Sequence, residues 1–326
     1  MQGFRLRRRA ALQGLVASAV TGTLGTAWAQ PARTLKLVVP FSAGGTADVL
    51  PRMVAEKLRA HYPGGVVVEN KPGAGGNIGA EQVFRADPDG LTLLVSPPGP
   101  IAVNHNLYRK LSFDPTRWVP VTVLATVPNI LAVRSRLPVQ SLTEFITYLK
   151  ANPGKVSVAT QGGGSTSHLT AALFMQLTGT DMNVVPYKGT APALVDLIGN
   201  NVDVFFDNIS SSAQHHQAGK LRILAVADEQ RSRVLPEVPT FSEQKLAAMQ
   251  AVTFFSVVAP PGTPAAVAVT LQRQFADALA APDVSQRFAE QGAEPRGWST
   301  EQTAQFIRNE TEKWNKVIKT ANVSLD

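Results

Sequence analysis

The fold of this chain is decided by one stretch, Leu35-Lys36-Leu37-Val38-Val39-Pro40-Phe41-Ser42-Ala43-Gly44-Gly45-Thr46-Ala47-Asp48. Its first five residues are mostly apolar and predict a short buried strand. Pro40 ends that strand because proline has no backbone N–H for another ladder bond. Thr46 is a candidate N-cap, and the residues after it carry an apolar helical stripe of Ala47, Leu50, Val54 and Leu58. The stretch therefore predicts a strand, a glycine-rich loop and a helix that packs on the sheet.

Gly44 and Gly45 give this loop a possible chemical role. A strand that enters a helix through two glycines exposes backbone N–H groups at the positive end of the helix dipole, which is a ready anion site. An ordinary tight turn between a strand and a helix has the same composition, so this stretch alone leaves both interpretations open. We expect a β-branched side chain at Gly45 to obstruct both the approach of a ligand to the backbone and any positive φ.

The same design returns in the second half of the chain. Val156–Thr160 predicts another short strand, followed by Gln161-Gly162-Gly163-Gly164-Ser165-Thr166-Ser167-His168. A helix with an apolar stripe comes next. One glycine-rich and hydroxyl-rich helix start in each half of the chain suits a small anion held between two lobes.

The N-terminal segment has the features of an export signal. Four arginines within residues 5–9 form a charged start, residues 11–27 are mildly apolar and small, and Ala27-Trp28-Ala29 is a typical cleavage site before Gln30. Its glycines and threonines make it too weakly apolar for a stable membrane span. Arg8-Arg9 faintly resembles a twin-arginine signal, but ordinary secretion ranks above it.

Composition narrows the class of protein. Without residues 1–29 the chain has 27 basic and 24 acidic residues, so its formal charge falls from +7 to +3. No dense Lys/Arg run remains, which argues against nucleic-acid binding. The absence of cysteine excludes disulfides and thiol chemistry, and the five histidines lack metal-ligand spacing. We expect no metal and no cofactor, and about 297 mature residues suggest roughly two domains.

Strands and helices alternate along both halves, which predicts an α/β fold with doubly wound, mostly parallel sheets. Ser96-Pro97-Pro98-Gly99-Pro100 should be an irregular loop at the carboxyl edge of the first sheet, where such folds bind ligands. The alternation restarts at Ser141, and the final helices most economically return to the first lobe, with crossings near Ile130 and Phe255. The predicted division is a signal peptide at 1–29, domain 1 at 30–129 and 255–326, and domain 2 at 130–254.

Catalytic motifs are scarce. The sequence has no P-loop, no His-Glu-x-x-His and no Gly-x-Ser-x-Gly, and Gly73–Gly79 departs from a dinucleotide fingerprint. Asp48 could be a catalytic acid, although a carboxylate in the first turn of a helix more often stabilises its amides. His168 could pack or contact a ligand, and Tyr187 and Asp207 lie at strand ends, where polar groups cap turns or touch ligands. These residues favour binding chemistry over catalytic chemistry.

Several segments together resemble one family. Pro40–Asp48 resembles the Pro-aromatic-x-x-Gly-Gly-x-x-Asp signature of the Bug family, the extracytoplasmic solute receptors of tripartite tricarboxylate transporters. Glu69–Gly79 resembles that family's second signature. Three further segments resemble motifs that are common in this family: Gly163–His168, Pro186–Gly189 and Gly219–Arg222. The resemblance covers nearly the whole mature chain in the right order.

The resemblance implies a two-lobed, type II periplasmic-binding fold with a small carboxylate in the interdomain cleft. It places the ligand contacts on the two loops and one flanking asparagine: Phe41, Ser42, Ala43, Thr46, Asn77, Gly163, Ser165 and Thr166. The supporting residues are Gly44, Gly45, Asp48, His168, Tyr187 and Asp207, with Asp48 bracing the first loop. Ala43 stands where many relatives carry proline, which would loosen this loop slightly.

The implied function is a periplasmic, monomeric receptor that passes a small carboxylate to the membrane permease of its transporter. The ligand could be a di- or tricarboxylate, an acidic amino acid or an aromatic acid, because backbone amides recognise a carboxylate and not the group that carries it. Two alternatives stay open. One is an exported α/β enzyme that acts on a small acid with Asp48 or His168 as base, and the other is a sensor that presents its ligand to a membrane partner.

Overall fold

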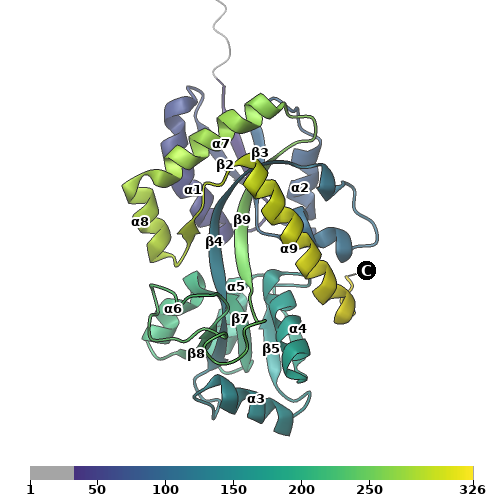
Figure 1. Cartoon of the computed structure of the whole chain (residues 1–326), viewed down its shortest axis with the longest axis vertical. Coiled ribbons are helices and arrows are strands. Elements are labelled where there is room, and N and C mark those ends of the chain that lie inside the picture. The colour runs from purple at the N-terminus through teal and green to yellow at the C-terminus, as the bar shows by residue number, and fades with distance from the viewer. Residues whose placement is uncertain (1–32, 326) are drawn as a thin grey trace, which may run out of the picture. The chain divides into compact units, whose positions relative to one another are not determined.

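The computed structural model describes residues 33–325, so the predicted signal peptide lies outside the described residues. A curled ten-stranded sheet runs through this part of the chain in the order β2-β1-β3-β9-β4-β7-β5-β6, with β8 and β10 paired to β4 (Figure 1). Within residues 33–325, no helix is both long and apolar enough to cross a membrane.

The elements alternate as the sequence predicts. The chain begins with β1 (Leu35–Val39), α1 (Thr46–Leu58), β2 (Val66–Asn70), α2 (Asn77–Phe84), β3 (Thr92–Ser96) and β4 (Val119–Arg134). It continues with α3 (Leu142–Ala151), β5 (Ser157–Thr160), α4 (Thr166–Thr178), β6 (Asn183–Pro186), α5 (Thr190–Ile198), β7 (Val204–Asn208), α6 (Ile209–Gln217) and β8 (Leu221–Val226). It ends with β9 (Val252–Ala259), α7 (Ala265–Ala280), α8 (Pro282–Glu290), β10 (Glu294–Pro295) and α9 (Thr300–Thr320).

Strand β4 belongs to both parts of the sheet. Val119 to Pro128 pair with β9, and Asn129 to Val133 pair with β7, all antiparallel. Pro128, which has no N–H to donate, lies at the last position before this change of partner. The apolar runs at residues 119–126 and 129–133 suggest two separate strands, whereas the structure has one strand of 16 residues. We call β1, β2, β3, β9, α1 and α2 the first lobe and β5 to β8 with α3 to α6 the second lobe. The residue boundaries predicted for the two domains stay a prediction.

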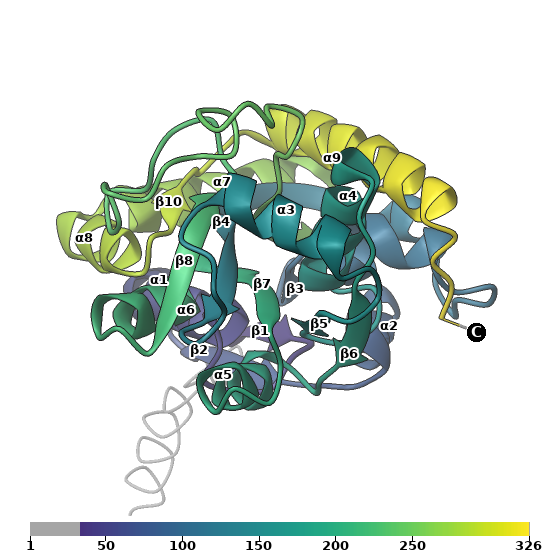
Figure 2. The same cartoon turned by 90° about the horizontal axis from the view of Figure 1, so that it is seen from below.

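The core lies on both faces of the sheet. Successive residues of a strand point to opposite faces, so Leu37 and Val39 join one hydrophobic cluster and Val38 the other. In the second lobe, α3 and α4 cover one face through Phe145 and Phe174, and the opposite face is covered by α5 and α6 (Figure 2). A parallel sheet covered on both faces explains the nearly continuous apolar run of β1.

Helices α7 and α8 lie against α1. Lys57 pairs with Asp283 of α8 at 2.8 Å, and Glu56 accepts a hydrogen bond from Arg287 at 2.8 Å. α7 adds Phe275 and Leu279 to the cluster that contains Leu50 and Val54 of α1. These contacts bury the apolar stripe of α7 against α1, so the helix needs no additional sheet to cover it.

The proline-rich stretch after β3 is partly regular. Gly99–Val103 form a single π-helical turn, so the expectation that Ser96–Pro100 has no regular structure is wrong for its last two residues. A proline at the start of a helical turn loses nothing by lacking an N–H, because that donor has no partner in the turn.

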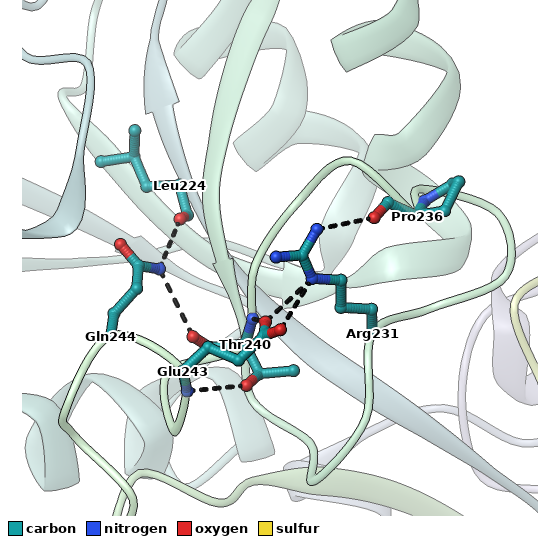
Figure 3. Close-up of polar contacts among 6 residues, drawn as sticks. All are labelled: Leu224, Arg231, Pro236, Thr240, Glu243 and Gln244. Carbon is teal, nitrogen blue, oxygen red and sulfur yellow. Dashed lines mark hydrogen bonds and ion pairs between the residues drawn. The ribbon is translucent and has the colours of Figure 1, made fainter.

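A long connection, residues 227–251, joins β8 to β9 and is held by side-chain bonds (Figure 3). Arg231 Nε donates to both carboxylate oxygens of Glu243 at 3.0 and 2.9 Å. Glu243 Oε2 also accepts from the N–H of Thr240, whose Oγ1 accepts from the N–H of Glu243. Phe241 is fully buried and anchors the segment in the core. Local sequence patterns do not indicate this arrangement, because the partners lie outside any helix or strand pattern.

Candidate ligand-binding site

Several helices begin where a strand of the sheet ends. α1 follows β1, α4 follows β5, α5 follows β6 and α6 follows β7. Ser165 Oγ caps α4 by accepting from the N–H of His168 at 3.2 Å. Among the described residues no side chain caps α1, α5 or α6, which begin after Gly45, Gly189 and Asn208. Uncapped N–H groups at the positive end of a helix dipole can bind an anion.

Thr46 connects the two lobes. Its Oγ1 lies 2.8 Å from Oγ of Ser210 in the first turn of α6. The expectation that Thr46 is the N-cap of α1 is wrong, because Gly45 occupies that position and Thr46 is the first helical residue. Its hydroxyl is thereby free of capping and finds a partner 164 residues further along the chain.

Asp48 braces the first loop. Its side chain is buried, and Oδ2 accepts from the N–H of Gly44 at 3.0 Å. Oδ1 accepts from Arg52 Nε at 2.8 Å and from Asn70 Nδ2 at 2.9 Å. Asn70 Nδ2 also donates to the carbonyl oxygen of Phe41 at 3.0 Å. The network ties both ends of the loop to the end of β2.

The same network sets the charge of Asp48. Burial raises the pKa of this carboxyl, but the hydrogen bonds from Arg52, Gly44 and Asn70 outweigh it and hold the pKa below its ordinary value. Asp48 is therefore ionised at neutral pH, and both of its oxygens already accept hydrogen bonds.

The paired glycines differ in conformation. Gly44 has a φ of +89°, whereas Gly45 has a φ of −87°. Gly45 thus has no positive φ for a side chain to obstruct, and the left-handed residue is its neighbour. Apart from Gly45 itself and its two chain neighbours, no described residue has an atom within 4 Å of a Cβ built on Gly45, and Ser42 and Ala43 are also exposed. The first loop presents its backbone outward.

Asn77 is held beside this loop by a neighbouring asparagine. It is 9% exposed, and its Oδ1 accepts from Asn104 Nδ2 at 2.6 Å. Gly76 precedes it with a φ of +93°, and a Cβ there would lie 3.2 Å from the ring of Phe41. The second signature therefore needs this glycine, because Cγ of Pro100 would lie 2.8 Å from the same Cβ and the aromatic ring of the first loop also packs there.

The second loop repeats the construction of the first. Gly164 has a φ of +70°, and its N–H donates to Nδ1 of His168, four residues on, at 3.1 Å. Gly44 and Asp48 have the same spacing and roles. Ser165 Oγ donates to the carbonyl oxygen of Gly162 at 2.7 Å, Gly163 is exposed and Thr166 is the first residue of α4.

His168 is an acceptor in this loop. Burial lowers its pKa, because an apolar environment disfavours the imidazolium. The neutral ring is also the form that can accept from Gly164 through Nδ1. A histidine used in this way stabilises backbone geometry.

Asp207 is fully buried at the end of β7. Its Oδ1 accepts from Gln161 Nε2 at 2.9 Å, and its Oδ2 accepts from Ser212 Oγ at 2.7 Å. Burial raises the pKa of Asp207 to about 7, although these donors act against it. Because Gln161 begins the second loop, Asp207 ties that loop to β7.

Tyr187 turns its hydroxyl toward α5. The hydroxyl donates to Asp196 Oδ2 at 2.6 Å, and burial together with this carboxylate raises the pKa of Tyr187 to about 12. The phenol is therefore engaged within its own lobe.

Four residues of the site were missed by sequence reasoning: Arg52, Asn70, Gln161 and Ser210. Arg52 lies at the i+4 position from Asp48, a spacing that predicts an ion pair on a helix, and it could have been found. The other three have partners that are distant in sequence, so no local pattern points to them.

The fold and these two loops define a two-lobed solute receptor. Residues 50–323 match the model of the tripartite tricarboxylate transporter family receptor, and the chain belongs to this family. It is also 37% identical to the protein BugT of Bordetella pertussis over 297 residues, which covers 90% of this chain and 91% of BugT.

Two solved structures extend the comparison. The R. palustris protein Rpa4515 with adipate superposes with a TM-score of 0.84 at 38% identity, covering 90% of this chain and 99% of that one. MatC (Rpa3494) from Rhodopseudomonas palustris with bound malate gives a TM-score of 0.80 at 32% identity, covering 88% and 99%.

Proposed function

We propose that this chain is a periplasmic receptor that captures a small dicarboxylate between its lobes and delivers it to the membrane permease of a tripartite tricarboxylate transporter. The relatives' adipate and malate are both dicarboxylates, which supports this ligand class. The export signal predicted at residues 1–29 supports the compartment.

One observation carries the proposal. Both lobes place a glycine loop at a helix start, and each loop is braced by the side chain four residues on, Asp48 or His168. The uncapped starts of α1, α5 and α6 add N–H groups to the same kind of strand end. One glycine loop with its helix start in each lobe suits a ligand that has a carboxylate at each end.

The proposal assigns no catalytic role to this site. Asp48 has a lowered pKa and accepts three hydrogen bonds, and His168 Nδ1 accepts from Gly164. A general base needs a free lone pair at the proton it removes. To act as a base, Asp48 or His168 would have to give up hydrogen bonds that hold its loop.

Calorimetric titration of the mature protein tests the ligand class. Adipate and malate should bind with one site per chain, and adipamide, which has the same length without charge, should not. A ligand at 100 times its Kd should add about 2.7 kcal/mol to the free energy of unfolding. Equal binding of adipate and adipamide would contradict carboxylate recognition.

Three further measurements complete the test. NMR of the ligand after incubation should show it unchanged, which separates a receptor from an enzyme. Mass spectrometry of the exported protein should place its N-terminus near Gln30, and light scattering should give the mass of a monomer. Transport of malate in cells that lack the receptor gene should fail and return with the gene; normal transport would favour a sensor.

A further inference from the structure

The C-terminal residues turn back from α9 toward the second loop. After Thr320, the N–H of Val323 donates to the carbonyl oxygen of Ile318 at 3.1 Å, which reverses the chain. The N–H of Leu325 then donates to the carbonyl oxygen of Leu107 at 3.2 Å. Val323 and Leu325 pack on the hydrophobic cluster that contains Leu107. The end of the described chain is thus anchored by both backbone and side chain.

Two leucine side chains lie directly on the glycines of the second loop. A Cβ built on Gly163 would be 2.4 Å from Cδ2 of Leu325. One built on Gly164 would be 2.3 Å from Cδ1 of Leu107 and 3.0 Å from Cδ1 of Leu325. These separations leave room for hydrogen and for no side chain, so the leucines cover the backbone of the loop closely.

These contacts cross from one lobe to the other. Leu107 follows the short helical turn Asn104–Asn106, and Asn104 bonds to Asn77 of α2 in the first lobe. Gly163 and Gly164 precede α4 in the second lobe. The Thr46–Ser210 hydroxyl contact is a second bridge between the lobes.

Helix α9 follows the same seam. A groove of about 390 Å³ separates Leu173 and Gln176 of α4 from Lys313 and Lys316 of α9. α9 therefore delivers the chain end to the start of α4, as the course of the yellow helix illustrates (Figure 1). A movement of the second lobe would slide α4 past α9 and pull the loop off the leucines.

We propose that Leu107 and Leu325 are positioning residues, which seat the second ligand loop in its closed position and so slow ligand release. The proposal rests on the proposed dicarboxylate receptor. Its physical basis is that the leucine contacts exist when the loop is seated and are lost when it moves, so they favour the closed state selectively. The C-terminal segment 322–325 thereby acts as a latch on the binding loop.

Leu325→Ala in the full chain tests the latch. Dissociation of adipate, measured by stopped-flow intrinsic fluorescence, should become about fivefold faster, because part of a half-buried leucine side chain is lost from the closed state. Leu325→Met should restore most of the wild-type rate, and Ser324→Ala on the same exposed turn should leave it unchanged. An unchanged rate in Leu325→Ala would overturn the proposal.

Hydrogen exchange gives a readout that needs no ligand. Leu325→Ala should speed amide exchange across residues 161–168 in the free protein, while exchange in α1 stays the same. This result separates the two proposals: a protein that binds neither adipate nor malate refutes the proposed function, whereas unchanged exchange refutes the latch.

A double-mutant cycle localises the contact. Gly163→Ala inserts a methyl where Leu325 Cδ2 lies, so it should disturb the loop more in the wild-type background than beside Leu325→Ala. The exchange rates should therefore be non-additive. Additive effects would mean that the two residues do not touch in solution.

Discussion

Asp207→Asn should remove a pH-dependent loss in the free energy of unfolding. The native carboxyl is fully buried between Gln161 and Ser212, and burial raises its pKa to about 7 from an ordinary 3.8. Asparagine has the same shape, and its oxygen can accept from Gln161 while its amide donates to the hydroxyl of Ser212. The variant therefore resembles the protonated aspartic acid at every pH.

The sign and size of the change in the free energy of unfolding follow from the difference in proton binding between the folded and unfolded states. Because the folded state holds this proton up to about pH 7, the contribution of Asp207 to the free energy of unfolding falls as the pH rises from about 4 to about 7. Each unit of pKa shift corresponds to about 1.4 kcal/mol, so the whole window spans about 4 kcal/mol. Below the window the contribution is fully present, and above it the contribution is lost. The stability of Asp207→Asn relative to wild type should rise by this amount across the window.

Urea unfolding followed by intrinsic fluorescence between pH 4 and pH 8 measures this difference. Asp203→Asn is the matched control in the same lobe, because burial opposes its ionisation but hydrogen bonds from Ser157 and Arg134 hold its pKa below the ordinary value. The stability of Asp203→Asn relative to wild type should therefore change little between pH 4 and pH 8, because the stability linked to a lowered pKa is lost only below that range. Parallel curves for wild type and Asp207→Asn would show that the Asp207 carboxyl titrates as it does in the unfolded chain.

Three further predictions concern the two loops and the long connection. Gly45→Val should weaken adipate binding at least tenfold with little change in Tm, because space at Gly45 is open but a side chain there blocks the backbone; unchanged affinity by calorimetry would remove this loop from the site. As the pH falls below about 6.5, protonation of His168 should cost stability, since burial lowers its pKa, and exchange at Gly164 should rise more than in His168→Gln; identical pH profiles would contradict this. Arg231→Ala should raise hydrogen exchange across residues 231–244 but not in β1, and equal protection of these residues in wild type and Arg231→Ala would refute the bracing role of the bonds from Arg231 to Glu243.

The local turns of this protein were predictable from sequence because their causes are local. Pro40 ends β1, and the glycines after it open the backbone at the start of α1. The second loop and α4 follow from the same composition at Gly162–Ser165. The family resemblance was carried by these short motifs, and the match over residues 50–323 confirms it.

Several details of the site depended on contacts between distant parts of the chain. Thr46 is a good N-cap by residue type, yet its hydroxyl lies against Ser210 in the other lobe. β4 continues through Pro128 because it pairs with β9 up to that residue and with β7 from Asn129 onward. Neither outcome can be read from the pattern of one segment, since each depends on which strand or helix lies alongside.

The sequence by itself determined where β1 and β5 end, where the glycine loops lie and which helices follow them, because φ restrictions and apolar spacing act over a few residues. The tertiary structure alone decided how those loops are held. Asn70 reaches Asp48, Gln161 reaches Asp207 and Leu325 covers Gly163 across 22, 46 and more than a hundred residues. Hydrogen-bond partners and steric neighbours at such separations are set by sheet order and register, which short-range preferences do not encode.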